Sequence, residues 1–269
     1  MTELSEQKPA TPLLEFRNVT IIRGTRPVLD SVSITIGEGE NIAILGPNGA
    51  GKSSFIKAVN REYYPVSGTK GTVFKIWGEE IWHVFEMRSL LGIVSNDLQY
   101  TFMRDLTGEE VVLSGFFSSI GLFNHPITPE MRRKADAIIR FLEIEHLRFR
   151  AMDGLSSGEA RRFLIGRALV NEPKALILDE PTNSLDLHAL FTFRQLLRKI
   201  AQNGTGIILV THHLHDIIPE ISRVVLMKDG KFVEDGSKAA MLTDEKIGCL
   251  FQVPVHVRQE NGWYYATGY

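Results

Sequence analysis

Residues 46–54 read Gly-Pro-Asn-Gly-Ala-Gly-Lys-Ser-Ser and lie between the apolar run Asn41–Leu45 and a helix-favouring run from Ser53. This order of strand, glycine-rich loop and helix is typical of a phosphate-binding loop. The glycines let backbone N–H groups turn towards one anion, and the helix directs its positive end at the same anion. Lys52 is expected to reach the terminal phosphates, and the Ser53 hydroxyl to ligate Mg²⁺. The pattern predicts a nucleoside triphosphate site made by Gly46, Pro47, Asn48, Gly49, Ala50, Gly51, Lys52, Ser53 and Ser54.

The composition is that of a soluble globular protein. The 269 residues carry a net charge of −2 with both signs spread along the chain, so there is no strong nucleic-acid signal. The single cysteine, Cys249, excludes an internal disulfide and suits a reducing compartment. Residues 1–13 lack the pattern of a signal peptide and are interpreted as a flexible N-terminal tail. No apolar run approaches the length of about 18 residues that spans a bilayer, so direct membrane insertion is not expected.

Strand-like and helical runs alternate along the chain, which predicts an α/β fold with a mostly parallel sheet covered on both faces. A helical region is expected over about residues 100–172, and another helix over Leu187–Gln202. Residues 96–100 are predicted to form a loop, and residues 251–269 a C-terminal β-hairpin extension that turns at Asn261-Gly262. Strands are predicted at Leu14–Val19, Val32–Ile36, Asn41–Leu45, Thr72–Ile76, Leu91–Ser95, Ala175–Leu178, Gly206–Val210 and Val224–Met227.

A pair of carboxylates supplies the chemistry that a phosphate loop alone lacks. Asp179 and Glu180 end the apolar run that begins at Ala175. Asp179 can hold Mg²⁺ through water, and Glu180 can orient and deprotonate the water that attacks the terminal phosphate. The two motifs together therefore predict nucleotide hydrolysis.

Three more motifs are relevant, and their order along the chain is informative. Leu155–Arg162 reads LSSGEARR, Pro181–Asp186 reads PTNSLD, and Thr211-His212 follows the next predicted strand. With the first two motifs, this order resembles the ATP-binding cassette (ABC) ATPases. The resemblance implies a P-loop NTPase with a RecA-like core, an antiparallel β-subdomain and a helical subdomain that carries the signature turn. The ATPase domain would span residues 14–250.

The resemblance also implies a homodimer in the ATP state. In that family two copies pair head to tail, so each ATP would lie between the phosphate loop of one copy and Ser156 and Gly158 of the other. Asp186 would lie at the seam between the copies. ATP would hold the dimer together, and hydrolysis would release it.

The expected catalytic residues are Glu180, His212 and Lys52, with His212 sensing the γ-phosphate as the resemblance implies. The nearby His213 and His215 suggest a metal site at first sight. The Thr-His position after a strand is explained by the family instead.

Three positions depart from the family pattern. Arg23 stands where an aromatic residue commonly stacks on adenine, and a planar guanidinium can also stack on a base. Asn96 stands where a glutamine usually ligates Mg²⁺, with Gln99 as a possible substitute, so the implied metal ligands are Ser53, Asn96 and Asp179. Ser157 and Glu159 replace a glycine and a glutamine of the usual signature, and hydrolysis is expected to survive both changes.

The run Leu113–Phe123 is unusually apolar for the start of the helical region. In transport ATPases this region receives a helix of the membrane subunit. Two interpretations stay open: docking of a partner, or packing within the subdomain. The docking residues would be Phe116, Phe117, Ile120 or Phe123.

The favoured function is the ATP-binding and ATP-hydrolysing subunit of an ABC transporter, which drives a separate transmembrane permease. It would be cytoplasmic and peripheral on the inner face of the cell membrane. The alternative is a soluble, non-transport ABC ATPase that acts as a switch on a protein or nucleic acid. Zinc modules, a long coiled coil and a second cassette are missing, which favours transport. The segments LSSGE and THHLHDI, with the strand-rich tail, also look like a branch labelled molybdenum-transport-like.

Overall fold

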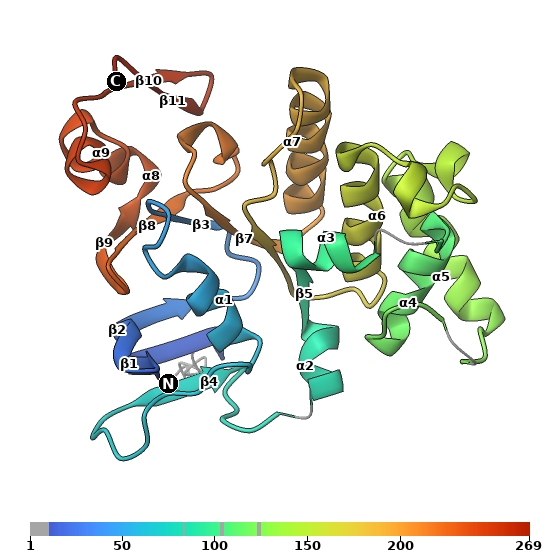
Figure 1. Cartoon of the computed structure of the whole chain (residues 1–269), viewed down its shortest axis with the longest axis horizontal. Coiled ribbons are helices and arrows are strands. Elements are labelled where there is room, and N and C mark those ends of the chain that lie inside the picture. The colour runs from blue at the N-terminus through green and yellow to red at the C-terminus, as the bar shows by residue number, and fades with distance from the viewer. Residues whose placement is uncertain (1–10, 83, 103–104, 123–124) are drawn as a thin grey trace, which may run out of the picture.

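The computed structural model of the chain describes residues 11–82, 84–102, 105–122 and 125–269, so residues 1–10 of the predicted tail lie outside it. A six-stranded sheet forms its centre (Figure 1). Its strands in spatial order are β5 (Leu91–Val94), β6 (Ala175–Asp179), β7 (Gly206–Thr211), β3 (Ile42–Leu45), β8 (Arg223–Lys228) and β9 (Lys231–Ser237). The first five run parallel, and β9 is antiparallel to β8. This is the predicted α/β arrangement.

The central strands are mostly apolar because both faces of the sheet are covered. On β3, Ala43 and Leu45 point into one core cluster, which includes α6 (Ser157–Leu169) and α7 (Leu187–Gln202). Ile42 and Ile44 point into a second cluster, which includes α1 (Lys52–Val59) and the antiparallel strands. The alternation along this strand therefore joins two halves of the protein through one sheet.

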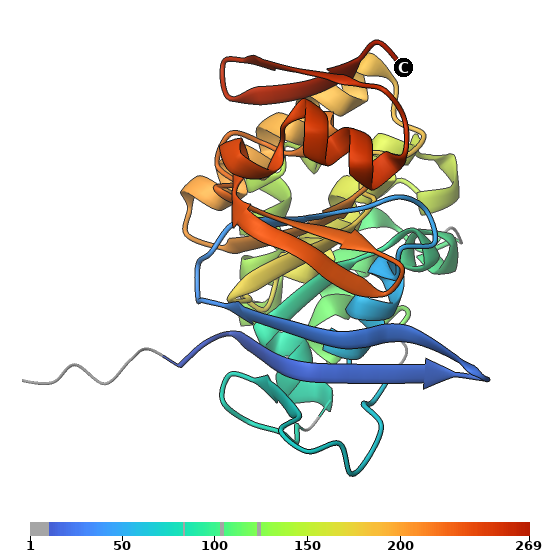
Figure 2. The ribbon, with the colours of Figure 1, turned by 90° about the vertical axis from the view of Figure 1, so that its left-hand side faces the viewer.

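The antiparallel strands form a separate three-stranded sheet, in the order β2 (Arg26–Ile36), β1 (Leu14–Arg23), β4 (Val73–Ile76). The long β1–β2 pair extends across the front of the molecule in Figure 2. Sequence patterns predicted both strands but with shorter bounds. The short helix α2 (Val84–Leu90) leads from this sheet into β5 and was not predicted.

Helices dominate the right-hand part of Figure 1. They are α3 (Asn96–Phe102), α4 (Gly108–Ser114), α5 (Pro129–Phe141) and α6, with 3₁₀ turns η1 (Gly115–Phe117), η2 (Glu145–Leu147) and η3 (Met152–Gly154). The prediction of a loop at residues 96–100 is wrong, because these residues begin α3. The Ser95 hydroxyl accepts the N–H of Leu98 at 3.3 Å, as a helix-capping residue does, and Leu98 packs partly buried against the core.

The C-terminal part contains more structure than the sequence patterns indicate. The turn η4 (Leu214–Asp216) follows β7, and the helices α8 (Lys238–Met241) and α9 (Asp244–Phe251) follow β9. The hairpin predicted at Asn261-Gly262 is present as β10 (His256–Glu260) and β11 (Trp263–Thr267). Among the described residues, no helix combines the length and apolarity needed to cross a membrane.

Candidate functional site

The phosphate loop is built on close backbone contacts that only glycine permits. A Cβ on Gly46 would lie 2.2 Å from the carbonyl oxygen of Met227 on β8. Gly51 caps α1 in a left-handed conformation with φ of 106°. The carbonyl of Ala50 accepts the N–H of Gly230 at 2.8 Å, which fixes the loop to the β8–β9 turn. The sheet therefore holds the loop at the carboxyl end of β3, as the sequence predicts.

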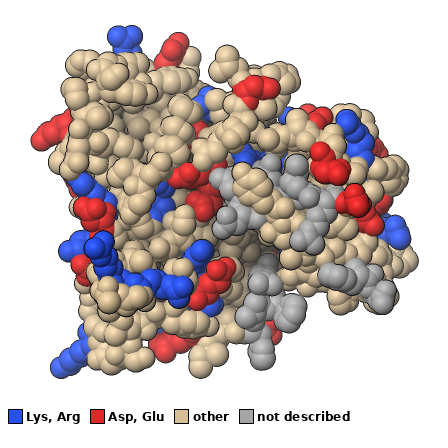
Figure 3. Space-filling model, viewed as in Figure 1, with Lys and Arg blue, Asp and Glu red and all other residues tan. Residues whose placement is uncertain are grey.

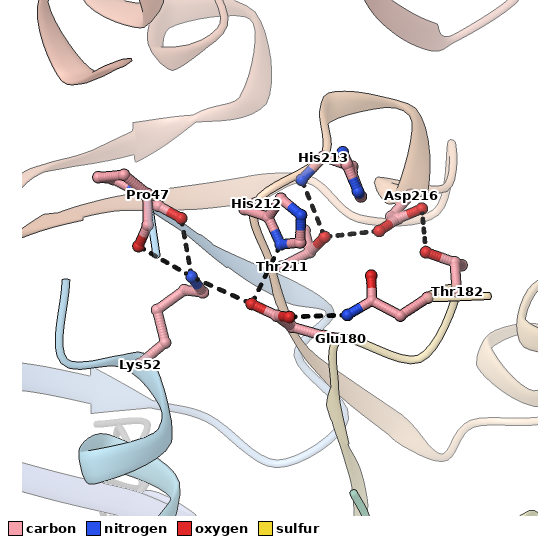
Figure 4. Close-up of polar contacts among 10 residues, drawn as sticks. Pro47, Lys52, Glu180, Thr182, Thr211, His212, His213 and Asp216 are labelled. Carbon is pink, nitrogen blue, oxygen red and sulfur yellow. Dashed lines mark hydrogen bonds and ion pairs between the residues drawn. The ribbon is translucent and has the colours of Figure 1, made fainter. Parts of the chain in front are cut away.

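Lys52 is buried at the start of α1, with a side-chain exposure of 5%. Its Nζ donates to the carbonyl oxygens of Gly46 at 2.8 Å and Pro47 at 3.0 Å, and lies 3.2 Å from Glu180 Oε1 (Figure 4). Three oxygen atoms around Nζ therefore fix the position of this positively charged group at the base of the loop. It is suited to binding an anion.

A cavity of about 470 Å³ opens above the loop. The loop residues Asn48, Gly49, Gly51, Lys52, Ser53 and Ser54 line it, together with Asp179 and Glu180. Figure 3 shows Lys and Arg side chains gathered over β2 and α1 on this face of the molecule. The structure therefore brings both predicted motifs to one cavity, and its volume is in the range of small-molecule sites.

Glu180 sits at the meeting point of three segments. Its Oε1 lies 3.1 Å from His212 Nδ1, and its Oε2 accepts the amide of Asn183 at 2.8 Å (Figure 4). Burial opposes ionisation, but the hydrogen bond from Asn183 and the charges of His212 and Lys52 outweigh it and lower the pKa of Glu180. A carboxylate that stays ionised can accept a proton from water. Asn183 has a role here that sequence reasoning missed, although it stands inside the quoted PTNSLD motif.

Oxygen donors suited to Mg²⁺ lie on the same cavity. The hydroxyl of Ser53 and the carboxylate of Asp179 both line it, and hydroxyl and carboxylate oxygens are ligands that Mg²⁺ prefers. The structure describes the backbone of Asn96 and Gln99 but not their side chains, so their predicted part in this site has no structural account. In the part of the chain that the structure describes, no group of three His, Cys, Asp or Glu residues could hold a metal ion by itself.

The signature turn lies in a different cavity. Ser156, Gly158 and Asp186 line this second space of about 240 Å³ together with Glu159. Ser156 caps α6 by accepting the N–H of Glu159, whose carboxylate in turn accepts the N–H of Ser156 at 2.8 Å. These hydrogen bonds lower the pKa of Glu159 despite partial burial. Ser156 and Glu159 therefore form a capping box that fixes the turn.

Arg23 lies at the end of β1 beside an aromatic residue that sequence reasoning missed. Its guanidinium carbon is 4.6 Å from the ring centroid of Tyr63, and Lys57 Nζ lies 5.6 Å from the same ring. Tyr63 follows α1 in the sequence, and Lys57 lines the phosphate-loop cavity. The stack of Arg23 on Tyr63 therefore lies next to that cavity.

Asp216 and Arg161 hold the loops around the site. Asp216 is only 1% exposed, and it accepts the hydroxyls of Thr182 at 2.7 Å and Thr211 at 2.5 Å (Figure 4). Arg161 on α6 donates to the carbonyls of Pro181 and Asn183, and burial lowers its pKa to about 10. Neither residue carries a local sequence signal for this role.

Some side chains of the apolar run 113–123 pack within the subdomain, and one is exposed. Phe116 packs partly buried against the core, and Phe117 stacks on His125 with ring centroids 4.3 Å apart. Ile120 is 42% exposed and lines a cavity of about 240 Å³ with Arg167 and Asn171 of the α6 region. Phe123 lies outside the described residues. Packing therefore accounts for the two phenylalanines described, and not for Ile120.

Comparison with known proteins places this geometry among transport ATPases. The profile of the family described as ABC transporter matches residues 29–183. An uncharacterized ABC transporter ATP-binding protein, YlmA, of Bacillus subtilis is 34% identical, with 91% of this chain and 93% of YlmA covered. The hemin import ATP-binding protein HmuV of Bradyrhizobium diazoefficiens is 30% identical, with 93% and 92% covered. A dimeric post-hydrolysis ATP-binding cassette bound to ADP and Pi superposes with a TM-score of 0.69 at 26% identity, over 83% of this chain and 98% of that one.

Proposed function

Because the chain belongs to the ABC transporter family, as an ATP-binding and ATP-hydrolysing subunit, we propose that it works as a head-to-tail homodimer that drives a separate transmembrane permease. The ATPase domain comprises residues 14–250, and residues 251–269 form an extension. The protein is cytoplasmic and lies peripherally on the inner face of the cell membrane.

One observation supports the dimer. The phosphate loop and the signature turn line different cavities of the same chain. Lys52 and Glu180 lie in one cavity, whereas Ser156, Gly158 and Asp186 lie in the other. Ser156 is exposed at the start of α6, so it is free to meet a ligand from outside the chain. A second copy that brings its signature turn over the first copy's loop would complete the site, and symmetry would complete two such sites.

The chemistry follows from the charges in the loop cavity. Lys52 and the loop N–H groups bind the phosphates, and the ionised Glu180 accepts the proton of the attacking water. His212 lies 3.1 Å from Glu180 and would contact both that carboxylate and the terminal phosphate. Ser53 and Asp179 would hold Mg²⁺, whose charge would offset the negative charge on the phosphates.

The permease contact is proposed at the cavity between β5, α3 and α6. Ile120 lies exposed at its edge, with Leu98 and Arg167 beside it. A helix with one apolar face and a carboxylate would match this combination.

The test is a Glu180→Gln protein trapped with Mg·ATP in its native cells. Loss of the base is expected to stop turnover while Lys52 still binds ATP, so a dimer should accumulate and carry a polytopic membrane protein with it. Size-exclusion chromatography and mass spectrometry of the membrane fraction measure both results. Glu172→Gln is the matched control, because Glu172 is 73% exposed and lies on the α6–β6 connection.

Two results would overturn parts of the proposal separately. A trapped protein that stays monomeric contradicts the head-to-tail dimer. A trapped dimer that is found only in the soluble fraction, with a nucleic acid or a cytoplasmic protein, contradicts the permease and supports the switch alternative.

A further inference from the structure

The C-terminal hairpin packs against the segment that follows His212. Strands β10 and β11 pair with each other, and within the described residues no other strand joins them. Strand β11 contacts η4, which begins two residues after His212. Tyr264 of β11 is only 4% exposed and belongs to the main core cluster. Figure 2 shows the hairpin at one end of the molecule, above α9. An isolated two-stranded hairpin is marginally stable, so its stability depends on these contacts.

The side-chain contact between the hairpin and α7 is specific. The guanidinium carbon of Arg194 lies 5.0 Å from the ring centroid of Trp263. Arg194 is half-buried, and its Nε has no hydrogen-bond partner among the described residues. Burial lowers the pKa of Arg194, while the nearby charge of Asp216 opposes this shift. The ring of Trp263 is therefore a principal partner of a partly desolvated cation.

Asp216 connects that cation to the catalytic residues. It is the last residue of η4, and its carboxylate accepts the hydroxyls of Thr211 and Thr182. Thr211 directly precedes His212, and Thr182 follows Glu180 by two positions. The same carboxylate therefore ties together the two loops that bring His212 and Glu180 within 3.1 Å of each other (Figure 4).

The turn of the hairpin is fixed to the same segment by a second set of contacts. Lys238 Nζ donates to the carbonyls of Ile218 and Pro219 at 3.1 Å and of Gly262 at 3.3 Å. A Cβ on Gly262 would lie 3.2 Å from the Pro219 side chain, so the two backbones approach closely. The segment after η4 is thus held between α8 and the hairpin.

We propose that the C-terminal hairpin is a positioning element for hydrolysis, which holds the His212 segment in the arrangement that reaches Glu180. Trp263 and Arg194 are positioning residues in this inference, because neither contacts the loop cavity. If the hairpin binds one arrangement of the segment better than others, it stabilises that arrangement by the same free energy. The inference rests on the roles proposed above for Glu180 and His212.

The test compares Trp263→Ala with Trp263→Phe in steady-state ATP hydrolysis by the full chain. The alanine variant is expected to lower kcat roughly 5- to 30-fold, the range for loss of one such contact, with KM changed less than about twofold. The phenylalanine variant keeps a ring for Arg194 and should restore most of kcat. Tyr269→Ala is the matched control, because Tyr269 is 81% exposed near the same hairpin and should leave both constants unchanged.

Arg194→Met tests the contact from its other side and decides the matter if the Trp263→Ala chain fails to fold by circular dichroism. It should lower kcat alone by a similar factor, and the double variant should lose no more than the larger single loss. The inference is overturned if both single variants keep kcat within about twofold, if Trp263→Phe is as impaired as Trp263→Ala, or if KM rises with the fall in kcat. An active Glu180→Gln protein would instead contradict the catalytic site itself, which these variants do not touch.

Discussion

Replacing Asp216 with alanine is expected to destabilise the fold strongly. The carboxylate is buried, and it accepts two hydroxyl groups, from Thr182 in the loop after β6 and from Thr211 at the end of β7. Its charge also acts on the half-buried Arg194 and the buried Arg161, where it opposes the lowering of their pKa values by burial. Alanine removes both hydrogen bonds and leaves both arginines without this opposite charge.

The magnitude follows from the two hydrogen bonds. Each bond to a charged group contributes about 1.5–3 kcal/mol, so Asp216→Ala should lower the free energy of unfolding by about 3–6 kcal/mol. Asp216→Asn keeps the shape and one carbonyl oxygen, so its cost should be about 1–2 kcal/mol. At roughly 2–4 °C per kcal/mol for a chain of this size, the melting temperature should fall by about 6–24 °C and about 2–8 °C respectively.

Thermal unfolding followed by circular dichroism measures both variants under one set of conditions. Asp153→Ala is the control, because Asp153 is exposed in η3 and should leave the melting temperature nearly unchanged. A shift below about 3 °C for Asp216→Ala, or an equal shift for Asp216→Asn, would show that the two hydroxyl contacts do not hold these loops.

Three further predictions concern the site and its surroundings. Burial lowers the pKa of His213 and His215 below 6.5. As the pH falls through that value, the unfolded state binds more protons than the folded state, and the free energy of unfolding decreases. Replacing both histidines with glutamine should reduce this loss of stability, measured by thermal unfolding at about pH 5.5. Arg23→Ala and Tyr63→Ala should each weaken ATP binding roughly 2- to 30-fold in calorimetry but leave tripolyphosphate unaffected, and equal weakening of both ligands contradicts base stacking. Gly46→Ala should weaken ATP and tripolyphosphate alike by more than about tenfold, because its Cβ would collide with a β8 carbonyl 2.2 Å away.

The parts of the fold that the sequence predicts are those whose signal is local. Helix α7 has the predicted bounds, because Asp186 caps it by accepting the N–H of Ala189 at 2.7 Å. Its buried Phe193, Leu196 and Ile200 follow helical spacing. The phosphate loop is equally local, since its glycines and Lys52 stand within nine residues.

The parts that sequence reasoning missed depend on contacts between distant segments. Strand β9 is mostly exposed and has little apolar alternation, and it forms because β8 supplies a paired edge. Tyr63 gives no signal as a partner of Arg23, because 40 positions separate the two residues in the chain. Helix α9 is a different kind of miss: Thr243 caps it and two acidic residues occupy its first turn, so a local signal was present.

The backbone at Glu180 explains why distant contacts matter most at this site. Glu180 has φ of 46°, a left-handed conformation that costs a non-glycine residue about 1–2 kcal/mol. Contacts from Lys52, His212 and Asn183 offset that cost. Asn183 belongs to the same loop as Glu180, whereas Lys52 lies on α1 and His212 follows β7. A sequence pattern can therefore identify the carboxylate but not the geometry that makes it a base.

Hydrogen bonds of Arg161 connect the signature-turn cavity with the phosphate-loop cavity within one chain. Arg161 lies on the helix that begins at the signature turn, and it holds the carbonyls of Pro181 and Asn183. If α6 moves, one possibility is that the loop of Pro181 and Asn183 moves with it, together with the Asn183 amide that donates to Glu180. The other is that the hydrogen bonds of the buried Arg161 guanidinium break. Leaving a buried charged group unsatisfied costs several kcal/mol, so moving the loop is the cheaper response. A ligand that pulls on Ser156 is therefore expected to change the position of the catalytic carboxylate in the same chain.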